Sequence, residues 1–128
     1  MNEKGICIET KNLCKTYYNS KQGVHVIKNI DMEIYKGDFT IIMGASGSGK
    51  TTLLYLLSAL DEMTSGEVYY GDRSINKMKL KELVNFRRNE IGYIFQGINL
   101  VPYLSVLENV AVVGKLTQRK NRNVVEDC

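Results

Sequence analysis

The sequence has little of the residues on which several common site chemistries depend. It contains one histidine, His25, and three cysteines, Cys7, Cys14 and Cys128, none of which lies in a Cys-x-x-Cys pair. A structural zinc site needs four nitrogen or sulfur ligands, so we expect no metal cluster. An odd number of unpaired cysteines is typical of thiols in a reducing compartment. Because His25 lies in an alternating stretch that predicts a solvent-facing side chain, a Ser–His–Asp hydrolase is disfavoured.

Long apolar runs are also missing. No segment approaches the roughly 18–20 consecutive apolar residues that cross a bilayer, and Met1–Gly5 is not followed by the apolar region of a signal peptide. We therefore expect a cytoplasmic chain that does not itself cross a membrane. The net charge of +3 and the pI near 8.7 stay below the pI above about 9 that is typical of a nucleic-acid binder. No nucleic-acid partner is expected.

The residues that are present indicate one globular α/β domain. The 128 residues are 44% hydrophobic and 24% charged, which is close to average globular usage. Alternation of apolar and polar residues over 5–10 and 24–35 predicts half-exposed antiparallel strands, joined by a polar loop over 18–23. The continuous apolar runs 39–43 and 91–95 predict strands buried on both faces of a parallel sheet.

Helical spacing of apolar residues appears in three further segments. Leucines over 52–60 predict a buried helix, and a second, amphipathic helix is predicted over 79–88. A third helix is predicted over 106–116, because Ser105 and Glu108 before it form a capping box. A short strand is predicted over 67–70, between two turns.

Residues Gly44–Thr51 match the G-x-x-x-x-G-K-[ST] pattern of a phosphate-binding loop. The glycines allow the backbone to curl so that its amides point at phosphate oxygens, and the next helix presents its positive N-terminal end to the same anion. Lys50 supplies a full positive charge, and the Thr51 hydroxyl is a hard oxygen ligand for Mg²⁺. We therefore expect nucleotide phosphates to bind here. The motif alone does not say to which class of P-loop protein the chain belongs.

Around this loop, five segments in order resemble the ATP-binding subunit of ABC transporters. The segment Lys15–Tyr17 is similar to the family's aromatic A-loop, and 28–38 is similar to the strand and turn before the phosphate loop. Met43–Leu54 is similar to the phosphate loop, and Leu60–Val68 to the turn after the first helix. Residues 91–110 are similar to the Q-loop with the helix behind it. Phe86–Arg88 most resembles the subfamily that serves lipoprotein release and macrolide-type export. The resemblance covers nearly the whole chain.

The resemblance implies a set of roles around Mg-ATP. Tyr17 stacks on adenine, with the adjacent Tyr18 as the alternative, and Gln96 joins Thr51 as an oxygen ligand of Mg²⁺. Lys50 stabilises phosphate charge, and the nucleotide-binding set is Tyr17, Gly44, Ala45, Ser46, Gly47, Ser48, Gly49, Lys50, Thr51 and Thr52.

The resemblance also implies partners. They are a transmembrane permease subunit and a second nucleotide-binding domain in a dimer, so the chain is expected on the inner face of the cell membrane. The apolar loop Leu100–Tyr103 either contacts the membrane subunit or folds onto the core.

The implied fold class is α/β, a P-loop NTPase of the ABC ATPase type with an N-terminal antiparallel β subdomain and an incomplete parallel core sheet. Residues 1–128 correspond to the N-terminal part of one such domain. The family's signature sequence, the Walker B strand ending in Asp-Glu, and the switch histidine normally come later. Because the general base belongs to that later part, the chain is expected to bind ATP without turning it over. Residues 39–43 and 91–95 are expected to lie parallel in one sheet without pairing directly.

Two other functions stay open at this point. A small P-loop kinase that phosphorylates a metabolite would need an acidic metal ligand after its second apolar strand, where this sequence has Gln96. A non-catalytic module that binds a nucleotide and a partner would need no general base.

Overall fold

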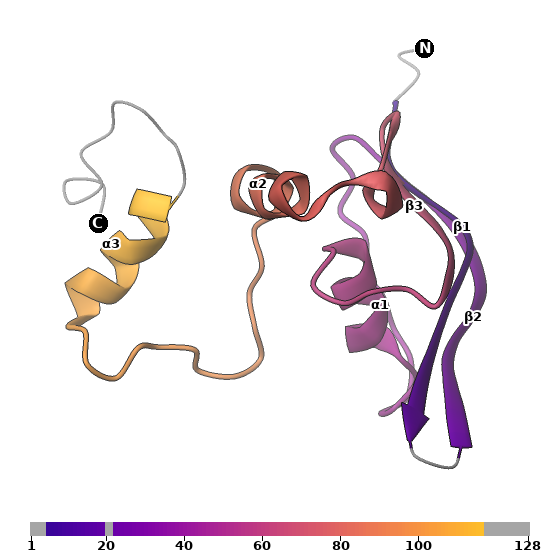
Figure 1. Cartoon of the computed structure of the whole chain (residues 1–128), viewed down its shortest axis with the longest axis horizontal. Helices are drawn as coiled ribbons and strands as arrows, with labels where there is room; N and C mark the ends of the chain where they lie inside the picture. Colours follow the sequence, from indigo (N-terminus) through magenta and orange to yellow (C-terminus); the bar gives the residue numbers. More distant parts are fainter. Residues whose placement is uncertain (1–4, 20–21, 117–128) are drawn as a thin grey trace. The chain divides into compact units, whose positions relative to one another are not determined.

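The computed structural model describes residues 5–19 and 22–116, which form two compact units. The first unit ends at Leu83 and the second begins at Val84. Each is described here by itself (Figure 1). Cys7 and Cys14 are free thiols, and Cys128 lies outside the described residues.

The first unit is built on a four-stranded antiparallel sheet with the strand order β2-β1-β3-β4. Its strands are β1 (Ile6–Asn19), β2 (Gln22–Tyr35), β3 (Ser65–Tyr70) and β4 (Arg73–Ser74). The predicted antiparallel strands are confirmed, and both are longer than predicted. The loop predicted over 18–23 is correspondingly too long, because Tyr18 pairs with Gly23 and Asn19 with Gln22. Cross-strand pairing extends the strands through polar residues that show no alternation.

A close approach of two backbones fixes how β3 lies on β1. Gly66 has a φ of +89°, and a Cβ there would lie 2.3 Å from the Asn12 carbonyl oxygen. The pairing of the two strands shifts register between Lys11 and Cys14, and Asn12 itself has a φ of 48°. Only glycine fits such a position.

Helix α1 (Lys50–Leu57) packs three of its four leucines into the core of the first unit, whereas Leu54 is exposed. The buried apolar side chains of this unit are Leu13, Ile27, Leu53, Leu56, Leu57, Val68 and Ile75. The helix ends three residues before the predicted Leu60, which is exposed. Two features end it: the Ser58 hydroxyl donates to the Leu54 carbonyl at 2.8 Å, and Ala59 has a φ of 54°.

The two continuous apolar runs form no strand, and this corrects the sequence prediction. Neither 39–43 nor 91–95 pairs with any strand within residues 5–19 and 22–116. Phe39 is 91% exposed and Ile94 is 97% exposed. A strand buried on both faces of a parallel sheet needs neighbouring strands on its edges, and the described chain supplies none to these segments.

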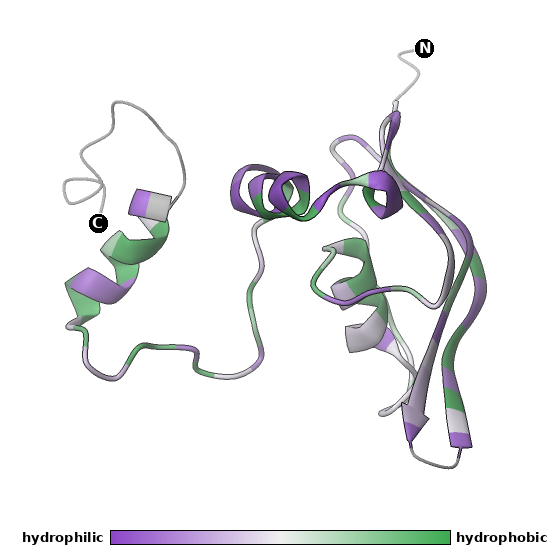
Figure 2. Cartoon of the chain, viewed as in Figure 1, coloured by the Kyte–Doolittle hydropathy of each residue, from purple (hydrophilic) through white to green (hydrophobic). Residues whose placement is uncertain are grey.

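The other helices are close to their predicted positions. They are α2 (Leu80–Glu90), which crosses the boundary between the units, and α3 (Val106–Leu116). A single 3-10 turn, η1 (Ile75–Lys77), was not predicted. Figure 2 shows that α2 is mostly hydrophilic, whereas apolar residues dominate α3. In the described part of the chain, no helix has the length and apolar character needed to cross a membrane.

The predicted capping box at the start of α3 is confirmed. The Ser105 amide donates to the Glu108 carboxylate at 2.8 Å, and the Glu108 amide lies 3.3 Å from the Ser105 hydroxyl oxygen. Hydrogen bonds from the backbone and then the side chain of Ser105 lower the pKa of Glu108. The box therefore satisfies amides that the first turn of the helix leaves without partners.

Candidate functional site

The glycine-rich loop curls between residues 39–43 and helix α1. Gly47 and Gly49 have φ values of +76° and +91°, and the Ser48 amide donates to the Ala45 carbonyl at 3.2 Å. At Gly49 a Cβ would lie 3.1 Å from the Val26 side chain and 3.2 Å from the Val26 carbonyl oxygen. Strand β2 therefore supports the end of the loop, and a side chain at Gly49 would push the loop away from it.

Lys50 folds back over the start of the same loop. Its Nζ donates to the main-chain oxygens of Gly44 at 2.9 Å and Ala45 at 2.7 Å, and it lies 3.5 Å from the Ser48 hydroxyl oxygen. These are neutral acceptors, so the full charge of the ammonium group is not neutralised by them. A phosphate oxygen would give Lys50 a stronger, charge-assisted partner at this position.

The N-terminus of α1 is open to an anion. Its N-cap residue is Gly49, which has no side chain to cap the first amides, and the first turn contains no acidic residue. The Leu53 amide already donates to the Gly49 carbonyl at 2.8 Å, so the amides of residues 50–52 are those that the helix leaves for an external acceptor. Thr51 is exposed in this turn, where its hydroxyl oxygen is accessible to a metal ion.

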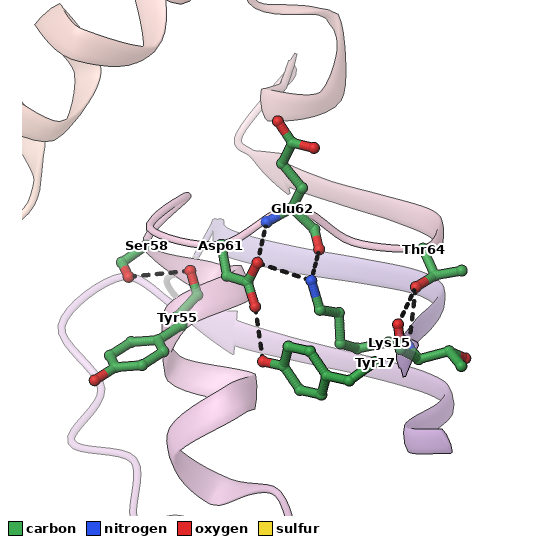
Figure 3. A network of polar contacts seen from close by, with 8 residues as sticks. Lys15, Tyr17, Tyr55, Ser58, Asp61, Glu62 and Thr64 are labelled. Carbon is green, nitrogen blue, oxygen red and sulfur yellow. Dashed lines mark hydrogen bonds and ion pairs between the residues drawn. The ribbon is translucent and has the colours of Figure 1, made fainter. Parts of the chain in front are cut away.

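Tyr17 lies on β1 in a polar network with two charged residues (Figure 3). Its hydroxyl donates to the Asp61 carboxylate at 2.7 Å, while Lys15 Nζ contacts the other oxygen of the same carboxylate at 2.7 Å. Lys15 Nζ also lies over the Tyr17 ring, 4.7 Å from its centroid. The Tyr17 side chain thus has its edge held by Asp61 and one face covered by Lys15.

The network shifts the pKa values of Tyr17 and Asp61 in opposite directions. Partial burial and then the hydrogen bond to Asp61 raise the pKa of Tyr17, and a side-chain interaction with Thr52 opposes this. Partial burial acts to raise the pKa of Asp61, but hydrogen bonds from Lys15 and Tyr17 lower it. The interaction with Thr52 links Tyr17 to the first turn of α1, the same turn that follows the glycine-rich loop.

The two adjacent tyrosines have different surroundings. Tyr17 is 40% exposed, whereas Tyr18 is 75% exposed. A Cβ on Gly23 would lie 3.2 Å from the Tyr18 ring, so this ring covers the glycine that pairs with it across the strands. Tyr18 therefore lies apart from the network around Asp61.

Gln96 lies in the second unit, in the loop after the apolar run 91–95, and its side chain is exposed. The remaining predicted site residues, Tyr17 and 44–52, belong to the first unit. The structure thus brings the proposed adenine and phosphate contacts together in one unit, and it describes the proposed second metal ligand separately.

Sequence reasoning missed Lys15 and Asp61 as parts of the site. Lys15 carries a local signal, because residues two apart on a strand share a face and Tyr17 follows it at that spacing. Asp61 carries none, because it is 44 residues from Tyr17 in the sequence. The segment after Asp61 is tied to β1 by the Thr16 amide, which donates to the Thr64 hydroxyl at 2.9 Å, and by the Thr64 amide, which donates to the Cys14 carbonyl at 2.9 Å.

In the second unit, the apolar loop Leu100–Tyr103, expected either to contact the membrane subunit or to fold onto the core, is bonded to α3 through the Asn109 side chain. Asn109 accepts a hydrogen bond from the Val101 amide at 2.8 Å and donates to the Val101, Leu104 and Ser105 carbonyls at 3.2, 3.0 and 3.0 Å. The loop and helix form an apolar groove of about 480 Å³. Its lining includes Leu100, Val101, Pro102, Val106, Val110 and Val113.

Fold and loop together define a P-loop nucleotide-binding protein of the α/β class. Residues 27–127 match the family model described as ABC transporter. The chain belongs to the ABC transporter family. The predicted fold class, an α/β P-loop fold of the ABC ATPase type, is confirmed by the solved cassettes to which the chain is similar.

Several ATP-binding proteins of ABC transporters are similar to this chain in sequence. The chain is 44% identical over 103 residues to the ABC transporter ATP-binding protein MJ0796 of Methanocaldococcus jannaschii, covering 80% of this chain and 44% of the relative. It is 40% identical to the bacitracin export ATP-binding protein BceA of Halalkalibacterium halodurans, covering 87% and 44%. It is 38% identical to the lipoprotein-releasing system ATP-binding protein LolD of Buchnera aphidicola, covering 89% and 50%.

The chain is also similar in three-dimensional structure to a solved ABC cassette. The dimeric ATP-binding cassette MJ0796 bound to ADP and phosphate has a TM-score of 0.83 to this chain at 39% identity, covering 90% of this chain and 50% of the cassette. The chain spans about half the length of the curated relatives it matches.

Proposed function

We propose that residues 1–128 are the N-terminal part of one ABC-type nucleotide-binding domain and bind Mg-ATP in the ATP-binding subunit of a transporter. The observation that carries this proposal is the arrangement at the start of α1. There the ammonium group of Lys50 lies on the glycine-rich loop, and the uncapped amides of residues 50–52 follow the same loop directly. A triphosphate is the ligand whose charge and length suit such an arrangement.

The nucleotide lies across two sets of residues in this proposal. Tyr17 stacks on adenine, and the phosphates lie in the loop formed by Gly44, Ala45, Ser46, Gly47, Ser48, Gly49, Lys50, Thr51 and Thr52. The nearness of Tyr17 to Thr52 supports one continuous site for base and phosphates. Lys50 exchanges its carbonyl acceptors for phosphate oxygens when the nucleotide binds.

Magnesium fits the oxygen donors available. Thr51 in the first unit is exposed, and its hydroxyl is a hard oxygen ligand of the kind that suits Mg²⁺. Gln96, in the second unit, is the second oxygen ligand that the resemblance to the family implies. When bound, the ion neutralises charge that develops between the β- and γ-phosphates. Lys50 and the loop amides orient the phosphates for that role.

Hydrolysis of ATP belongs to the longer relatives in this proposal. The chain spans about half the length of these relatives, and the family's signature sequence and the Asp-Glu that supplies the general base normally come later in the domain. We expect the chain to release phosphate from ATP no faster than background. Phosphate release that is linear in protein and depends on Lys50 would contradict this expectation.

The partners follow from the family. We propose a transmembrane permease subunit and a second nucleotide-binding domain, so that the chain acts as a peripheral component on the inner face of the cell membrane. Support for the dimer comes from the dimeric MJ0796 cassettes. BceA is named for bacitracin export and LolD for lipoprotein release, which agrees with the resemblance of Phe86–Arg88 to that subfamily.

Titration calorimetry with ATP tests the central assignment. We expect Lys50→Ala to weaken ATP binding at least tenfold, because several phosphate charges lose their nearest full positive charge. Lys81→Ala is the matched control, since Lys81 is an exposed helical lysine of α2. Equal ATP affinities of the wild type and Lys50→Ala would overturn the phosphate-loop assignment.

A further inference from the structure

Lys15, Tyr17 and Asp61 form a closed cycle of contacts that the proposed function leaves unexplained (Figure 3). The cycle consists of the Tyr17 hydroxyl on one Asp61 oxygen at 2.7 Å, Lys15 Nζ on the other Asp61 oxygen at 2.7 Å, and Lys15 Nζ over the Tyr17 ring at 4.7 Å. Each of the three side chains therefore restricts the other two. A tyrosine held at its hydroxyl and on one face has lost most of its rotational freedom.

The charged pair in this cycle is itself held firmly. Lys15 is 8% exposed, and its Nζ also donates to the Glu62 main-chain oxygen at 2.5 Å. The Asp61 carboxylate accepts a further hydrogen bond from the Glu62 amide at 2.7 Å. Buried lysine charge needs such partners, so the pair keeps one geometry rather than several.

This geometry leaves one face of the Tyr17 ring for a ligand. The ammonium group covers the other face, where a planar base would meet a cation and its hydrogen-bonded partners. Stacking requires ring planes in contact, so a base approaches only from the side opposite Lys15. Ordering this ring before the ligand arrives removes an entropic cost from binding.

We propose that Lys15 and Asp61 are positioning residues, which fix the Tyr17 ring so that a purine base stacks on the face opposite Lys15. This inference rests on the proposed function, because it takes Tyr17 as the adenine platform. It adds that the platform is preorganised by a charged pair that does not touch the nucleotide. The pair acts on the base alone, since neither residue belongs to the loop that holds the phosphates.

The test compares two ligands that share phosphates and differ in the base. Calorimetry measures the affinities of ATP and of inorganic tripolyphosphate for each variant. The readout is the ratio of the ATP affinity to the tripolyphosphate affinity. Damage to the fold or to the phosphate loop lowers both affinities together, whereas loss of stacking lowers the ratio. Tyr17→Ala removes the platform and should lower the ratio about tenfold or more. Tyr18→Ala is the matched control and should leave it unchanged.

Two mild variants then isolate positioning from stacking. Tyr17→Phe keeps the ring and loses the hydroxyl that binds Asp61, and Lys15→Met keeps an apolar stem and loses the ammonium group. We expect each to lower the ratio about threefold with tripolyphosphate affinity unchanged. If Tyr17→Phe and Lys15→Met both keep the wild-type ratio while Tyr17→Ala lowers it, the positioning role is overturned. The assignment of Tyr17 as the adenine platform is then retained. An unchanged ratio in Tyr17→Ala would overturn the platform and this inference with it.

Discussion

The antiparallel sheet and the two apolar runs 39–43 and 91–95 differ in where their hydrogen-bonding partners lie. Strands β1 and β2 are joined by a short connection, and β3 returns to pair with β1. Residues 39–43 and 91–95 pair with no strand within the described chain, and most of them are exposed. A strand forms where its neighbours are available, so apolar content alone does not produce one.

The same difference separates the site residues. The glycine-rich loop begins after the unpaired run 39–43, yet its far end is supported by β2 and by the buried face of α1. Gln96 follows the run 91–95, which pairs with no strand of the described chain. We infer that phosphate binding depends on the sheet of the first unit, whereas positioning of Gln96 depends on strands that the described chain does not form.

The largest expected effect contrasts a core residue of the sheet with an apolar residue of an unpaired run. Leu13 on β1 is completely buried, and we expect Leu13→Ala to lower the free energy of unfolding by about 3 kcal/mol. Ile94→Ala should change it by less than about 0.5 kcal/mol, since little surface is buried there. Urea denaturation followed by circular dichroism measures both. Equal losses would mean that residues 91–95 are packed in solution.

A somewhat smaller effect is expected where two backbones meet. Gly66→Ala forces a φ of +89° on a residue with a Cβ and brings that Cβ against Asn12, so we expect a loss of at least about 2 kcal/mol. Gly71→Ala is the control, because its φ is +57° and no atom lies within 4 Å of the added Cβ. It should cost about 1 kcal/mol in the same urea experiment. A Gly66→Ala loss no larger than that of Gly71→Ala would show that β3 does not approach β1 as closely as described.

In the second unit the expected effect is local. Asn109→Ala removes the hydrogen bond that the Val101 amide donates to Asn109 and the bonds that the Asn109 side chain donates to the Val101 and Leu104 carbonyls. A net hydrogen bond is worth about 1 kcal/mol, so exchange of the Val101 amide should accelerate roughly five- to tenfold in hydrogen-exchange NMR. Asn99→Ala serves as control, because the Asn99 side chain donates to the nearby Gly97 carbonyl at 3.4 Å. Unchanged exchange at Val101 would show that the loop is held by its apolar contacts instead.

How much was predictable depends on how far apart the interacting residues lie in the sequence. The glycine-rich loop and the Ser105–Glu108 capping box are local patterns, and both were predicted from their own residues. The end of α1 was missed by three residues, because the left-handed conformation of Ala59 has no signal in its side chain. Such conformations depend on tertiary contacts, which the alternation of residue types does not encode.

The two larger misses have different causes. Apolar runs 39–43 and 91–95 read as buried strands, because composition reports the environment a segment favours and not whether neighbours are present to provide it. Asp61 was missed for the opposite reason, since its partners Lys15 and Tyr17 lie on a strand 44 to 46 residues earlier. Pairings at that separation appear only when the chain is folded.

The smallest expected effect concerns the pH dependence that the Asp61 network adds to the sheet. Hydrogen bonds from Lys15 and Tyr17 hold the pKa of Asp61 below its ordinary value of 3.8 in the folded chain. A carboxyl group with a lowered folded pKa stabilises the fold above its unfolded pKa, and this contribution is lost as the pH falls through the folded pKa.

Urea unfolding midpoints measured between pH 6 and pH 2.5 should therefore fall less steeply below about pH 4 in Asp61→Asn than in the wild type. Asp72→Asn, which changes an exposed carboxylate in the turn between β3 and β4, controls for the loss of one negative charge and should keep the wild-type slope. If Asp61→Asn and the wild type lost stability in parallel over this range, the Lys15–Asp61 pair would not be formed in solution. The ring of Tyr17 would then lack the partner that fixes its hydroxyl.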